Sequence, residues 1–107
     1  MKRYQVIVTP EAQAGIIQSF FYIHERSAMN GERWLRQLYA QIDTLERMPE
    51  RCPPAREGEY LEEDLRHLIF KSHRVVFRVD KKSDTVYVLE VRHSRRLAIG
   101  EVEPEEG

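Results

Sequence analysis

The sequence has 107 residues, of which 41% are hydrophobic and 33% are charged, and a chain of this kind folds as one compact domain with one hydrophobic core. The single cysteine, Cys52, excludes an intramolecular disulfide, and no apolar stretch is long enough for a secretory signal or a membrane span. The net charge is only −1, yet residues 66–96 carry nine lysines and arginines against three acids, which indicates either a surface for an anionic partner or a salt-bridged surface strand. We therefore expect a cytoplasmic, globular protein that does not bind membranes.

The chain opens with a short β-branched run, YQVIVT at residues 4–9, which predicts one strand. A helix start follows, because Thr9 can cap, Pro10 suits the first helical position and Glu11 lies favourably against the helix dipole. We expect this helix to run to about Arg26. Its apolar stripe consists of Ala12, Ile16, Phe20 and Ile23, widened by Ile17 and Phe21.

A second amphipathic helix follows an interruption at SAMNG, residues 27–31. Two helices joined by a short turn usually lie antiparallel, so their apolar stripes are expected to form a common core. The stripe of the second helix consists of Trp34, Leu35, Leu38, Ile42 and Leu45.

Three prolines and a glycine in MPERCPPAREGEY, residues 48–60, predict an irregular connection after this helix. A loop of this length in a small domain is often functional. Cys52 lies within it without a neighbouring histidine or a CxxC partner, so a structural role is favoured over a reactive one.

Three strands close the domain at residues 64–70, 73–79 and 85–93, joined by turns that permit only antiparallel hairpins. Because side chains alternate along a strand, one face of the sheet must cover the helices while the other collects arginines. With strict alternation, one face of the middle strand carries Val75, Phe77 and Val79, and its other face carries Arg74, Val76 and Arg78. On the last strand, one face carries Tyr87, Leu89, Val91 and His93, and the other face carries Val88, Glu90 and Arg92.

Residues 97–107 are rich in glutamate and glycine, which predicts a disordered acidic tail after a single domain at residues 1–96.

The order of these elements resembles the RelE/ParE superfamily of toxins from type II toxin–antitoxin systems. Three segments carry the resemblance: VIVTPEA, TLERMPERCPP, and LRHLIFKSHRVVFRVDKKSDTVYVLEVRHSRR. It covers about residues 4–96 and is closer to the ParE, plasmid-stabilisation branch. The fold that it implies is α+β, with an N-terminal strand, a two-helix hairpin and three antiparallel strands in one sheet that has the helices on one face.

The resemblance implies a toxin that a cognate antitoxin neutralises in a hetero-oligomer. ParE-like members inhibit DNA gyrase by binding, whereas RelE-like members cut messenger RNA on the ribosome, and one fold thus serves two mechanisms. The non-enzymatic gyrase interpretation is favoured here. The alternatives are a ribosome-dependent RNase and an inactive orphan that only binds a partner, the latter in keeping with a pI near 6.4.

Two sets of site residues follow from these interpretations. A nuclease would use Arg74 to hold phosphate and His93 as acid or base, assisted by Arg78 or Arg92. One nuclease branch of the superfamily has this arginine and histidine, but it follows the histidine with a tyrosine, where this chain has Ser94. An antitoxin or target would dock on the arginine-rich face. No cofactor or metal is expected, and His67 and His73 are interpreted as structural. The expected docking residues are Arg74, Arg78, Arg92, Arg95 and Arg96.

Overall fold

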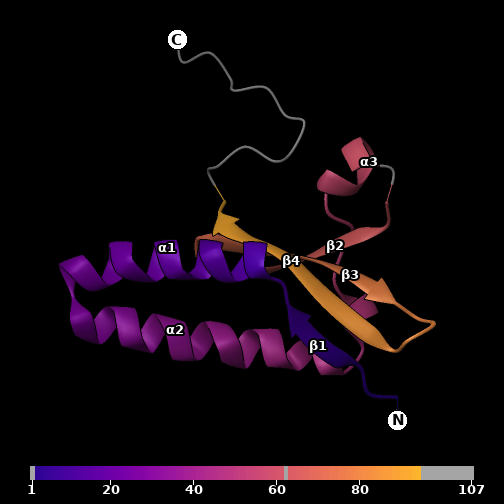
Figure 1. The fold of residues 1–107 in the computed structure, drawn as a ribbon, viewed down its shortest axis with the longest axis horizontal. Helices are drawn as coiled ribbons and strands as arrows, with labels where there is room; N and C mark the ends of the chain where they lie inside the picture. The colour runs from indigo at the N-terminus through magenta and orange to yellow at the C-terminus, as the bar shows by residue number, and fades with distance from the viewer. Residues whose placement is uncertain (1, 62, 95–107) are drawn as a thin grey trace.

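A computed structural model describes residues 2–61 and 63–94 of the chain, so the predicted tail at residues 97–107 lies outside the described residues. Within these ranges the fold is α+β, as expected (Figure 1). The elements are β1 (Gln5–Val8), α1 (Pro10–Arg26), α2 (Ala28–Asp43), the 3-10 turns η1 (Thr44–Glu46) and η2 (Pro49–Arg51), α3 (Glu57–Leu61), β2 (Leu65–Phe70), β3 (His73–Asp80) and β4 (Thr85–His93).

The four strands form one sheet in the order β1-β4-β3-β2. The two hairpins β2–β3 and β3–β4 are antiparallel, and the first strand pairs in parallel with the last. In Figure 1, α1 and α2 lie side by side against the sheet, while the short α3 stands apart from them near β2. The expected helix hairpin and single sheet are thus confirmed.

The caps predicted at the start of α1 are formed. The Thr9 side chain accepts a hydrogen bond from the Ala12 amide at 3.3 Å and donates one to the Val88 carbonyl at 2.8 Å, so it ties the helix start to β4. Pro10 occupies the first turn, and α1 ends at Arg26 as expected. This cap therefore fixes both the helix boundary and its position on the sheet.

The interruption expected at residues 27–31 is limited to a single residue. Ser27 is extended, its amide caps the end of α1, and its side chain accepts from the Asn30 amide at 3.2 Å to begin α2. Gly31 fits inside α2 because the helices touch there: a Cβ at this position would lie 2.9 Å from the Cα of His24. The glycine marks a close helix contact and does not break the helix.

The main core lies between α1, α2 and one face of the sheet. Gly15 lets α1 approach β4, since a Cβ there would lie 2.2 Å from the Val91 carbonyl oxygen. Both predicted helix stripes contribute to this core, but Ile17 and Phe21, which were expected to widen the first stripe, are exposed. The fully or nearly buried members of the core include Ala12, Ile16, Trp34, Leu38, Ile42, Leu45, Phe70, Val75, Phe77, Val86, Val88 and Val91.

The alternation expected along β4 is wrong in one place, because the β3–β4 ladder contains a bulge. Val76 is opposite Glu90 and Phe77 is opposite Val88, which leaves Leu89 as the extra residue. A bulge of this kind shifts the face on which later side chains lie. Val88 therefore packs in the helix-covered core together with Val91, and it does not share a face with Glu90.

In the portion of the chain that the structure covers, none of the helices combines the length and the apolar character needed to cross a lipid bilayer.

Candidate functional site

The segment between η2 and β2 is built along the outer edge of the sheet, and it is more regular than the predicted irregular loop. The Ala55 amide donates to the Leu65 carbonyl at 2.8 Å, and the His67 amide donates to the Pro53 carbonyl at 3.1 Å. The Arg66 guanidinium holds the same segment by donating to the Cys52 carbonyl at 2.7 Å. These contacts position α3 on the face of the sheet that α1 and α2 do not cover, which we call the helix-free face.

The first residue of α3, Glu57, enters a buried group of charges on this face. The Arg74 guanidinium donates two hydrogen bonds to the Glu57 carboxylate, each 2.8 Å long, and one to His67 Nδ1 at 2.9 Å. Arg92 donates to Glu57 Oε2 from its Nη2 and contacts Glu90 Oε1 from its Nε at 3.0 Å. We call these five residues, Glu57, His67, Arg74, Glu90 and Arg92, the arginine–glutamate cluster.

The charges in the cluster are supported by apolar packing. Ala55, Leu65 and Val76 are buried beside it, and the bulge residue Leu89 packs against them. Exclusion of water strengthens each ionic contact and makes an unpaired charge very unfavourable. Glu57 itself is only 1% exposed, so its carboxylate depends on the two arginines for compensation.

Titration of the cluster reflects this packing. Burial raises the pKa of Glu57, but the hydrogen bonds from Arg74 and Arg92 outweigh it and hold the pKa at about 2. Burial, followed by the neighbouring Arg74 charge, lowers the pKa of His67. Burial raises the pKa of Glu90 despite the attraction of Arg92. Near neutral pH, therefore, His67 is uncharged, and its Nδ1 can accept the hydrogen bond from Arg74.

Arg74 and Arg92, two of the expected docking residues, are only 4% and 3% exposed in this conformation, and their docking role stays a prediction. They do lie on the helix-free face, but Glu57 covers and pairs with them. Arg78 remains partly exposed on that face, with its guanidinium 5.0 Å from the centre of the Tyr87 ring. Arg95 and Arg96 lie outside the described residues.

Glu57 is the site residue that sequence reasoning missed as an arginine partner. It lies in a segment expected to be irregular, 17 residues before Arg74 and 35 before Arg92. The only local signal was an acidic residue in a loop long enough to be functional. Its pairing depends on the path of that loop across the sheet, which periodicity does not encode.

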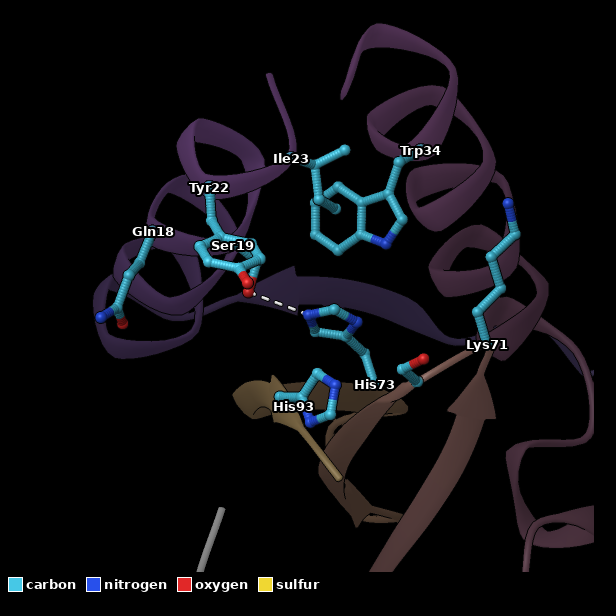
Figure 2. A pocket seen from close by; sticks show the side chains of 9 residues that line it. Gln18, Ser19, Tyr22, Ile23, Trp34, Lys71, His73 and His93 are labelled. Atoms are coloured by element: carbon cyan, nitrogen blue, oxygen red, sulfur yellow. Dashed lines mark hydrogen bonds between the residues drawn. The ribbon is translucent and has the colours of Figure 1, made fainter. Parts of the chain in front are cut away.

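A second candidate feature, a cavity of about 570 Å³, lies on the opposite side of the sheet at the end of the helix hairpin (Figure 2). His73 Nε2 is 2.9 Å from Ser19 Oγ, and the His73 ring stands 4.9 Å from the Trp34 ring and 5.4 Å from the His93 ring. Figure 2 shows His73 and His93 side by side beneath Ser19 and Trp34. The other lining residues are Gln18, Tyr22, Ile23, Lys71 and Ser72.

Arg74 and His93, the pair that a nuclease would need, lie on opposite faces of the sheet. Arg74 is opposite Arg92 in the ladder and both bind Glu57, whereas His73 is opposite His93 and both line the cavity beside α1 and α2. An acid–base residue must reach the group that it serves within about one hydrogen-bond length. Arg74 and His93 thus cannot act together on one phosphate in this conformation.

In residues 2–61 and 63–94, no group of three or more histidine, cysteine, aspartate or glutamate side chains is arranged to hold a metal ion. His67 instead accepts a hydrogen bond from Arg74 and His73 contacts Ser19, so both have structural partners.

The chain is similar to toxins of toxin–antitoxin systems, both in sequence and in fold. The model of a family described as the ParE toxin of the type II toxin–antitoxin system parDE matches residues 6–98. A solved structure, the toxin–antitoxin complex RelBE2 from Mycobacterium tuberculosis, contains a chain with the same fold: the TM-score is 0.63 at 23% identity, over 87% of this chain and 93% of that one. A search of curated proteins gave no significant match.

Proposed function

This chain belongs to the ParE toxin family of type II toxin–antitoxin systems, and on that premise we propose that it arrests growth by binding DNA gyrase. The proposed action is docking without covalent chemistry, and the proposed regulator is a cognate antitoxin that covers the toxin in a hetero-oligomer. The family match supports a toxin, and the arrangement of Arg74 and His93 favours binding over RNA cleavage.

The observation that carries the choice is the separation of these two residues by the sheet. Cleavage through the 2′-hydroxyl of RNA needs a base, an acid and a cation around one phosphate. Arg74 is engaged by Glu57 on one face, while His93 lies beside His73 on the other. A docking toxin needs no such convergence, so the observed arrangement is compatible with it.

The proposed docking surface is the accessible part of the helix-free face. Arg78 is partly exposed there in the present conformation, and Arg95 and Arg96 follow β4 in the sequence. Complementary charge steers encounters with an acidic partner. The RelBE2 structure is a complex of a toxin with its antitoxin, which supports an antitoxin as a second partner of this chain.

The test compares gyrase activity with translation. We expect the purified protein to abolish supercoiling of relaxed plasmid by gyrase while a cell-free translation reaction continues and its messages stay intact. His93→Gln should inhibit gyrase like the wild type, because His93 lies on the other face of the sheet. Relaxation by a type I topoisomerase provides the control for nonspecific DNA binding.

Opposite results would separate the alternatives. Messages cut at ribosome-bound positions, with cutting lost in His93→Gln, would overturn the gyrase proposal in favour of a nuclease. Normal growth on induction, together with unaffected gyrase and translation, would leave only a partner-binding protein without toxicity.

A further inference from the structure

In the arginine–glutamate cluster, two buried guanidinium groups, those of Arg74 and Arg92, share the carboxylate of Glu57. We propose that Arg74 and Arg92 form an oxyanion-binding site on the helix-free face, with His67 positioning Arg74, and that Glu57 closes the site as an internal ligand carried on α3. The ligand class is a carboxylate or a phosphate. This inference rests on the geometry of the cluster and does not depend on gyrase being the target.

The carboxylate of Glu57 accepts hydrogen bonds from both guanidinium groups. Both oxygens of Glu57 are used by Arg74, and Oε2 is shared with Arg92. The planar fork of a guanidinium matches the two oxygens of a carboxylate or phosphate. Two buried guanidinium groups held side by side repel one another unless an anion lies between them, so the site requires an oxyanion whatever its source.

Glu57 is the member of the cluster that contacts both arginines through its carboxylate. Glu90 contacts Arg92 through Nε at 3.0 Å. His67 presents Nδ1 to Arg74 as an acceptor, which leaves its charge at zero. Removal of the Glu57 carboxylate therefore takes away the anion that Arg74 and Arg92 share.

Helix α3 is a short unit that local backbone hydrogen bonds close on itself. It has five residues, and the backbone bonds at its glycine are local: Gly58 donates to the Ala55 carbonyl, and Glu63 donates to the Gly58 carbonyl, both at 3.1 Å. A Cβ on Gly58 would lie 2.3 Å from the Glu63 oxygen, so the turn is closed on itself. The segment can thus move as one piece when the Glu57 contacts are exchanged for those of an external anion.

We call α3, residues 57–61, the lid of this site. Its movement away from the sheet would expose Arg74 and Arg92, which the present conformation buries. It would convert a neutralised surface into a cationic one beside the partly exposed Arg78. The structure thereby provides a switch between a closed state without an external ligand and an open state that binds an oxyanion.

Isothermal titration of full-length variants with inorganic phosphate and with acetate, at ionic strength matched by sodium chloride, tests the site. Glu57→Ala is expected to bind at least one of the two anions tenfold or more tightly than the wild type. The double variant Glu57→Ala/Arg74→Ala should lose that binding, and Glu59→Ala, on the exposed side of the same helix, should behave like the wild type. The two titrations distinguish a phosphate site from a carboxylate site.

Should Glu57→Ala fail to fold, Glu57→Gln preserves the side-chain volume and removes the charge. Its thermal midpoint should then rise with phosphate or acetate more than that of the wild type. Equal anion affinity in the wild type and the folded Glu57 variant, or binding that persists without Arg74, would overturn the site.

Movement of the lid is measured separately by hydrogen exchange in the wild type. Phosphate or acetate, raised to concentrations that saturate the wild type itself in the titration, should accelerate exchange in residues 57–61, with exchange in α1 unchanged. An exchange rate in residues 57–61 that is the same with and without anion would overturn the lid and show that Glu57 closes the site permanently.

Discussion

Arg74 and Glu57 form a two-point ion pair across the helix-free face of the sheet, with 2.8 Å at each contact and both side chains nearly inaccessible to solvent. This pair connects the segment after the helix hairpin to the middle of the sheet. It explains why the most basic part of the sequence does not produce a uniformly exposed cationic surface.

Replacing Glu57 by glutamine should destabilise the protein strongly, because Arg74 and Arg92 would remain buried without their shared anion. Breaking a buried ion pair on one side typically costs about 3–5 kcal/mol of unfolding free energy. Urea denaturation at pH 7 measures this change. Glu59→Gln, at an exposed position of the same helix, should stay within ~0.5 kcal/mol of the wild type, and a similarly small effect at Glu57 would contradict the assigned pairing.

Stability should fall in acid because the folded pKa of Glu57 is about 2, below its ordinary value of 4.5. A depressed carboxyl pKa stabilises the fold above the unfolded pKa, and this contribution, about 3 kcal/mol, disappears as the pH falls from about 5 towards 2. His67, whose pKa is lowered by burial and by Arg74, adds a decrease below its ordinary pKa of 6.5, whereas the raised pKa of Glu90 acts in the opposite direction.

Unfolding free energies of the wild type and Glu57→Gln, measured from pH 7 to pH 3, isolate the Glu57 contribution. The difference between the two proteins should shrink as the pH falls below 5. Parallel curves for the two proteins would show that Glu57 does not titrate with a depressed pKa.

Gly15→Ala should separate α1 from β4, although alanine is ordinarily the better helix former by about 1 kcal/mol. The added Cβ would lie 2.2 Å from the Val91 carbonyl oxygen, and a backbone atom cannot move aside as a flexible side chain can. We expect a loss of ~2 kcal/mol or more, within the range for core overpacking, in chemical denaturation. Glu25→Ala on the exposed side of α1 is the matched control, and a stabilised Gly15→Ala would contradict this helix position.

Arg78→Glu should weaken binding to an acidic partner without unfolding the protein, because Arg78 is partly exposed and contacts the Tyr87 ring. For one charged group at the edge of an interface we expect a change of ~1 kcal/mol, or roughly fivefold in affinity. The effect should decrease at high salt as the charges are screened. The affinity for gyrase, measured at two salt concentrations, tests this expectation. Arg33→Glu, at an exposed position of α2, is the control. Equal effects of the two variants would show that Arg78 has no docking role.

Local sequence determined much of the fold, because helix caps and apolar periodicity act within a few residues. Thr9 and Pro10 defined the start of α1, and the stripes from Ala12 to Leu45 defined the faces that form the core. The short turns after residues 70 and 80 left only antiparallel hairpins for the closing strands. These features depend on neighbours along the chain, and they therefore agree with the structure.

Tertiary structure decided the features that join distant segments. The bulge at Leu89 arises where β3 and β4 accommodate each other, and it transferred Val88 to the core face. The pairing of Glu57 with Arg74 depends on a segment that follows the edge of β2, and the opposite placement of Arg74 and His93 depends on the ladder register. Periodicity within one segment specifies which residues share a face, but only the folded chain specifies which charges meet across it.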